Sequence, residues 1–100
     1  MPAAPALFQP GDSLTVSNAT AVLEQGLQAL AQQQSAIDMA LVAIIDSSAV
    51  AVLLAWQRAA AERRQMLIFR NLPDNLRSLI ALYGVDELLP TDAGEHPQDR

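Results

Sequence analysis

The chain has 100 residues, the length of one domain, and 51% of them are hydrophobic while 17% are charged. That balance is typical of a globular domain and excludes a charge-rich disordered chain. The 11 acidic residues outnumber the 6 basic ones, and the formal net charge of −5 excludes the basic surface that binds nucleic acid or anionic lipid.

The sequence also argues against export or membrane insertion. It contains no cysteine, and residues Met1–Pro10 lack both the basic and the apolar regions of a secretory signal. The longest apolar run, Met39–Ile45, is about a third of the roughly 20 residues that a membrane span requires. We therefore expect a cytoplasmic protein that does not insert into a membrane.

The first part of the chain predicts two short strands. A proline-rich lead-in includes a short edge strand near Leu7–Gln9. Residues Ser13–Val16 then alternate between polar and apolar, which predicts a half-buried strand with Leu14 and Val16 facing inward.

An amphipathic helix is expected next, over Ala19–Gln33, with Asn18 as its cap. Residues Ile37–Ile45 are almost continuously apolar, as in a central strand that is covered on both faces. The polar triplet Asp46–Ser48 ends this run and precedes a second helix, predicted over Ala49–Arg64.

The last part predicts a third strand and a third helix. The strand is expected at Met66–Phe69, and the helix opens near Pro73, with Asn71 as a candidate cap, and ends at Gly84. Its core stripe is Leu76, Leu79, Ile80 and Tyr83. The alternation of strands and helices predicts an α/β domain with a small, largely parallel sheet over residues 1–90, followed by a flexible polar tail over 91–100.

The sequence offers little for catalysis or for cofactors. The single histidine, His96, lies in the polar tail without a second ligand, so we expect no metal site. The dispersed glycines do not form a phosphate-binding loop, and we expect neither a cofactor nor a small-molecule substrate. Without a histidine in the folded part, Ser47 and Ser48 lack the base that a serine nucleophile needs.

The triplet Asp46-Ser47-Ser48 lies where α/β folds place functional groups, after a central strand and at a helix N-terminus. It can serve as a helix cap or as a partner-binding turn. The second helix carries an additional apolar stripe with Val52 and Trp56. That stripe either covers the edge of the core or faces outward as an interface anchor.

The run AIIDSSAVAVLL at residues 43–54 resembles the signature turn of the STAS domain family. The resemblance extends from Leu7 to Leu89, and it implies an anti-sigma-factor-antagonist-like α/β fold. In LAWQRA (54–59) and FRNLPDNLRSLIALYGVDELL (69–89) the chain is most similar to STAS subunits of phospholipid-transporting ABC transporters in Gram-negative bacteria. Ala49 departs from the glycine that is usual after the serines.

The resemblance implies a non-catalytic accessory subunit that binds the transporter's ATPase subunit and, through it, the inner membrane. The partner-binding residues expected from the turn and the second helix are Asp46, Ser47, Ser48, Ala49, Val52 and Trp56. In the alternative, an anti-sigma factor antagonist, Ser48 matches the serine that a partner kinase phosphorylates. A phosphate there would add about −1.5 to −2 charges beside Asp46.

Overall fold

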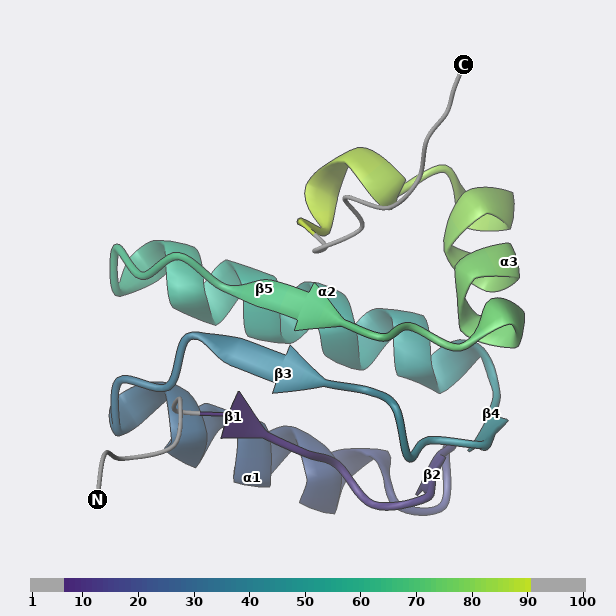
Figure 1. The fold of residues 1–100 in the computed structure, drawn as a ribbon, viewed down its shortest axis with the longest axis horizontal. Coiled ribbons are helices and arrows are strands. Elements are labelled where there is room, and N and C mark those ends of the chain that lie inside the picture. Colours follow the sequence, from purple (N-terminus) through teal and green to yellow (C-terminus); the bar gives the residue numbers. More distant parts are fainter. Residues whose placement is uncertain (1–6, 91–100) are drawn as a thin grey trace.

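The computed structural model describes residues 7–90, which form a small α/β domain (Figure 1). The predictions for the polar tail and for His96 lie outside the described residues. In chain order, the elements are β1 (Leu7–Phe8), β2 (Ser13–Leu14), α1 (Ala19–Ala31), β3 (Ala36–Asp38), β4 (Ile44–Ile45), α2 (Ser47–Glu62), β5 (Ile68–Arg70), α3 (Asp74–Tyr83) and the 3-10 turn η1 (Asp86–Leu88).

The strands are parallel, as the alternation predicted. They form a three-stranded sheet in the order β1-β3-β5 and a separate two-stranded ladder of β2 with β4. The prediction that the first strand lies at an edge is confirmed. The β2–β4 ladder lies beyond the carboxyl ends of β1 and β3, at the end of the molecule where α2 begins (Figure 1).

The prediction of one continuous strand over residues 37–45 is wrong, because the chain turns after β3. The Asp38 carboxylate accepts a hydrogen bond of 3.0 Å from the backbone N–H of Ala40, which bends the chain as Asx turns do. The N–H of Val42 then donates to the carbonyl of Met39 at 3.1 Å. The run re-enters a ladder only at Ile44, so part of it is exposed.

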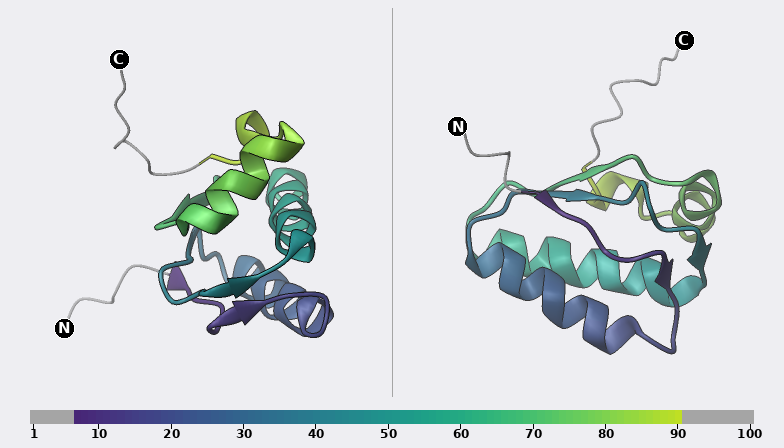
Figure 2. Two further views of the ribbon diagram at one scale, coloured as in Figure 1. Left: turned by 90° about the vertical axis from the view of Figure 1, so that its right-hand side faces the viewer. Right: turned by 60° about the horizontal axis from the view of Figure 1, so that its bottom comes forward.

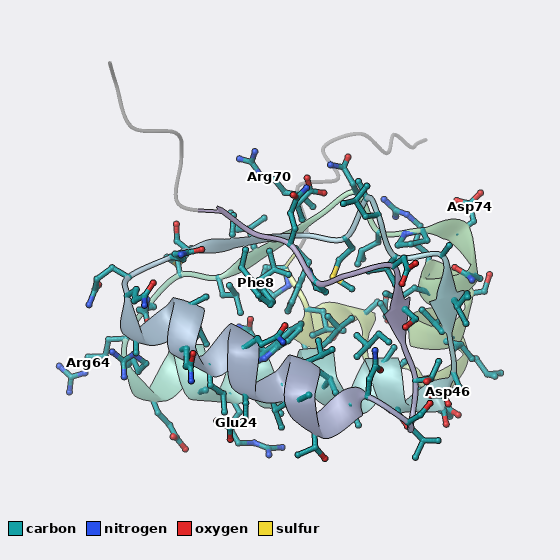
Figure 3. All side chains as sticks on the ribbon, turned by 90° about the horizontal axis from the view of Figure 1, so that it is seen from below. Phe8, Glu24, Asp46, Arg64, Arg70 and Asp74 are labelled. Carbon is teal, nitrogen blue, oxygen red and sulfur yellow. The ribbon has the colours of Figure 1, made fainter. Side chains whose placement is uncertain are left out.

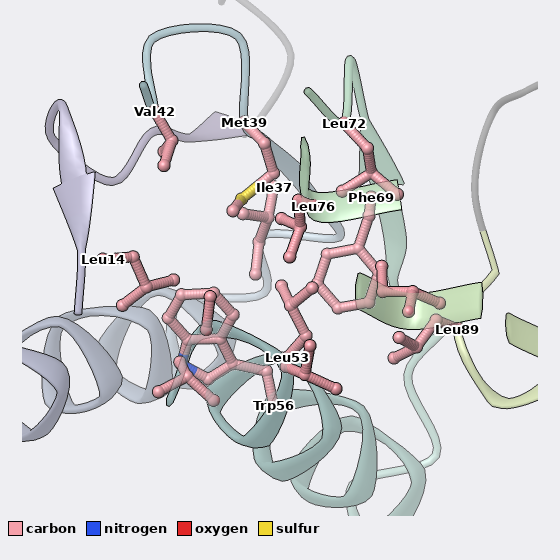
Figure 4. Packing of buried hydrophobic residues seen from close by; sticks show 14 of the residues in the cluster. Leu14, Ile37, Met39, Val42, Leu53, Trp56, Phe69, Leu72, Leu76 and Leu89 are labelled. Atoms are coloured by element: carbon pink, nitrogen blue, oxygen red, sulfur yellow. The ribbon is translucent and has the colours of Figure 1, made fainter. Parts of the chain in front are cut away.

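Helices α1 and α2 cover one face of the sheet (Figure 2). In the register of the sheet, Ile37 lies beside Phe69, and both side chains are buried. They lie in a cluster with Leu53 and Trp56 of α2 (Figure 4). This single core holds the sheet and the helices in place, and α3 packs against α2 beside it.

Local hydrogen bonds explain where two of the helix predictions fail. Asn18 does not cap α1 with its side chain; the side-chain amide oxygen (Oδ1) of Asn18 accepts from the N–H of Thr15 at 2.9 Å instead. Asn71 does not cap α3, because Pro73 holds that position and the Asn71 side chain donates to Asp38.

The end of α3 was predicted correctly in one respect and wrongly in another. Gly84 ends the helix in the left-handed conformation, with φ of 69°, as predicted. Tyr83 was expected in the core but is 51% exposed, and Val85, just past the end of the helix, packs against the core instead. The described end of the chain returns to the sheet, where the N–H of Phe69 donates to the carbonyl of Pro90 at 3.0 Å.

Candidate functional site

Asp46 holds the start of α2 against the loop that follows β2. One of its carboxylate oxygens accepts from the N–H of Ser48 at 2.8 Å, and the other accepts from the N–H of Val16 at 2.9 Å. The hydrogen bond from Val16, helped by those from Ser48, lowers the pKa of the Asp46 carboxyl in spite of the partial desolvation that raises it. The prediction that the triplet caps a helix is confirmed, and the cap also fixes the neighbouring loop.

The two serines of the triplet have different environments. Ser47 is exposed, whereas Ser48 is half-buried and its hydroxyl bonds to the Asp46 carboxylate. A partner can therefore reach the Ser47 side chain without disturbing the cap. A group attached to the Ser48 hydroxyl would instead lie against Asp46.

Of the two readings of the second apolar stripe of α2, the structure confirms the one in which it covers the core, and the outward reading is wrong. The side chains of Ala49 and Trp56 are 0% exposed and that of Val52 is 4% exposed. The Trp56 indole N–H donates to the carbonyl of Leu23 in α1 at 3.0 Å, and its ring meets that of Phe8 edge to face. Because α2 packs against the sheet and also against its neighbour α1, both of its apolar stripes are covered, and these three side chains are not at the surface of the folded domain.

Other apolar residues are exposed around the turn, at positions where the sequence pattern predicted burial. Val16 is 76% exposed, although the alternation predicted that it faces inward. Ile44 is 61% exposed and Leu41 is 59% exposed, although both belong to the run that predicted a buried strand. Two features of the sequence are consistent with this exposure. Asp38, a residue type that favours Asx turns, precedes the apolar run, and Val16 has polar neighbours on both sides.

A second polar cluster lies at the end of β3, where Asp38 accepts hydrogen bonds from the side chains of Asn71 at 3.0 Å and Gln9 at 3.1 Å. The bond from Asn71 is the main cause that lowers the pKa of Asp38, and the positive charge of Arg70 adds to it. The cluster ties together the segments that follow the three strands of the sheet. Within residues 7–90, the acidic and histidine side chains do not gather into a group that could hold a metal ion.

Figure 3 shows that Asp46 and Asp74 lie toward one end of the domain and Arg64 toward the other. Arg64 follows the C-terminus of α2, while Asp46 precedes its N-terminus. The site thus lies at the end of the molecule that carries Asp46 and Asp74, with the triplet, Val16 and Ile44 on adjoining segments.

Comparison with known proteins assigns the fold to a family. A search of curated proteins gave no match. In the part of the chain that the structure describes, the helices are too short or too polar to cross a membrane. The family model described as "Mlab, STAS domain" matches residues 11–90, and STAS domains are generally non-catalytic. With its parallel strands in open sheets and its three helices, the chain belongs to the STAS domain family and is most like MlaB.

Proposed function

We propose that this domain is a non-catalytic accessory subunit that docks onto the ATPase subunit of a phospholipid-transporting ABC transporter and stabilises or activates it. The proposal is supported by the MlaB-like family match and by the resemblance of residues 54–59 and 69–89 to such subunits. Inner-membrane association would then come through the partner.

The observation that carries the proposal is the exposed Ser47 on a turn that is already rigid. Asp46 fixes this turn by its two backbone hydrogen bonds, so little conformational entropy is lost when a partner binds there. The exposed Val16 side chain adjoins the turn and adds apolar area. A preformed loop with a polar group and apolar neighbours is suited to protein docking.

The ATPase contact is therefore expected at Ser47, Val16 and Ile44, with Asp46 and Ser48 supporting the turn from behind. This assignment replaces the α2 stripe of the sequence analysis. Ala49, Val52 and Trp56 contribute to partner binding only by holding α2 in position.

The test is co-purification of the tagged protein with the ATPase and permease subunits from detergent-solubilised membranes of the source bacterium. Ser47→Arg places a large, positively charged side chain in the contact and is expected to abolish recovery of the ATPase. Ser78→Arg is the matched control, since Ser78 is exposed on α3. Equal recovery of the ATPase with both variants would contradict docking through the turn.

The same experiment separates the transporter from the signalling alternative. Mass spectrometry of the recovered protein reports whether Ser47 and Ser48 are modified. Recovery of a soluble kinase with phosphate on Ser48, and without transporter subunits, would replace the transporter proposal with an anti-sigma factor antagonist.

A further inference from the structure

The exposed apolar residues around the turn come from separate loops at the same end of the domain. We define the carboxyl-end patch as Val16, Leu41, Ile44 and Ser47. Val16 follows β2, Leu41 lies in the turn after β3, and Ile44 begins β4. The β2–β4 ladder and the hydrogen bond from Val16 to Asp46 hold these segments together.

The charges beside this patch are acidic. Asp12 and Asp74 are exposed, and backbone contacts place both beside the patch. The Asp12 carbonyl accepts hydrogen bonds from the N–H groups of Ala43 and Ile44. Asn75, the neighbour of Asp74, donates from its side chain to the Ala43 carbonyl at 3.4 Å. Asp46 adds a third negative charge at the turn, where hydrogen bonds from Val16 and Ser48 favour its ionised form. We call Asp12, Asp46 and Asp74 the acidic rim.

The arginines nearest in the fold offset the rim only in part. Arg70 lies by the carboxylate of Asp38, which is not part of the rim. Arg77 lies one turn after Asp74 on the same side of α3 and offsets the charge of Asp74, which leaves Asp12 and Asp46. Three other arginines, Arg58, Arg63 and Arg64, lie in or after the C-terminal half of α2, at the far end of the helix from Asp46 (Figure 3).

We propose that the carboxyl-end patch binds a basic segment of the partner protein, with apolar side chains that cover Val16 and Ile44 and arginine or lysine side chains that face the acidic rim. This proposal rests on the proposed function and defines the chemistry of the ATPase surface. An anionic membrane surface is a poor occupant, because the rim and the net charge of −5 would repel it.

Charge complementarity of this kind acts mainly on the rate of association, whereas buried apolar contacts act mainly on dissociation. The two parts of the proposal are therefore separable by kinetics. The probe is the purified ATPase subunit, measured by surface plasmon resonance at several salt concentrations.

Ile44→Ser and Val16→Ser are expected to raise Kd about tenfold or more, through faster dissociation. Met66→Ser is the matched control, because Met66 is 75% exposed in the loop before β5, at the other end of the sheet. The double variant Asp12→Asn/Asp74→Asn is expected to slow association about threefold at low salt and to weaken its salt dependence. Thermal melts of each variant verify that it is folded.

A photo-crosslinker placed at residue 44 in cells tests the same surface without assuming the partner. An adduct with a peptide that contains arginine or lysine beside apolar residues supports the proposal, and a peptide from a second copy of this chain overturns it. Residue 66 serves as the control position. Absence of any adduct at residue 44 also overturns the proposal.

The outcomes distinguish this inference from the proposed function. If the ATPase binds, but the serine and asparagine variants have the same Kd and the same rate constants as the wild type, the proposed binding patch is wrong and the transporter role stands. If the ATPase does not bind, but a basic apolar peptide of another protein crosslinks at residue 44, the patch is right and the transporter role is wrong.

Discussion

Trp56→Ala separates a core role from a binding role at a residue for which the sequence left both open. In the fold, the indole is fully buried, its N–H donates to Leu23, and its ring lies 5.8 Å from the ring of Phe8, centroid to centroid. A side chain added at Gly26 would clash with it, so the indole packs directly on the backbone of α1. Truncation would therefore open a cavity between the sheet and both long helices.

The expected loss is large for a domain of this size. Truncation of a buried Trp to Ala costs about 3–5 kcal/mol, out of a total stability of about 5–15 kcal/mol. Each kcal/mol lowers the Tm of a 60–100-residue domain by about 4–8 °C, so we expect a fall of about 12–40 °C. Trp56→Phe, which keeps an aromatic ring but loses the N–H donor, should cost clearly less.

The measurement is urea and thermal unfolding followed by far-UV circular dichroism, because Trp56 is the only tryptophan and cannot serve as a probe in its own variant. Binding to the ATPase should weaken only as far as the domain unfolds. If Trp56→Ala lost less than about 1 kcal/mol of stability but still lost its partner, the side chain would be a surface anchor. The packing described here would then be refuted.

Other substitutions test the turn and the helix ends. Asp46→Ala should lower Tm more than Asp46→Asn, which keeps a capping oxygen, as thermal melts will show. Because folding lowers the pKa of Asp46 below its ordinary value of about 3.9, its ionised form stabilises the fold above that pH, and this contribution should vanish as pH falls through the folded-state pKa; carboxyl chemical shifts report it. Ser48→Asp should raise the pKa of Asp46 more than Ser47→Asp does, because only Ser48 bonds to that carboxylate. Gly84→Ala should cost about 1–2 kcal/mol in urea unfolding, because alanine disfavours a φ of 69°.

The sequence predicted those features that local chemistry determines. The Asp46 cap, the glycine at the end of α3 and the alternation of strands and helices each follow from a few neighbouring residues. Parallel pairing follows from that alternation. Two strands of one sheet that are connected through a helix run parallel, because the helix carries the chain back to the starting edge of the sheet. These predictions needed no information about distant contacts.

The errors arose where distant contacts decide exposure. Periodicity showed that α2 has two apolar stripes, but it could not show that α1 covers the second one through the contact between Trp56 and Leu23. Likewise, the composition of residues 39–45 does not distinguish a buried strand from a turn that buries Met39 and Val42 and exposes Leu41 and Ile44. The turn is closed by the hydrogen bond from the N–H of Ala40 to Asp38, and the distant side chains of Asn71 and Gln9 hold that carboxylate in place.

The turn at Asp46–Ser48 contains both residues that maintain the fold and a residue that a partner can reach. Asp46 is bonded to two segments, and Ser48 is bonded to Asp46, so a change at either residue alters the N-terminus of α2 before it alters a contact. Ser47 has the exposed side chain of the three. A positive group at Ser47, as in Ser47→Arg, would repel the basic partner segment and leave the cap intact, whereas a negative group at Ser48 would oppose the cap itself. Loss of binding without loss of stability is therefore expected for a substitution at Ser47. Loss of both is expected at Ser48, so the two positions separate an effect on the contact from an effect on the fold.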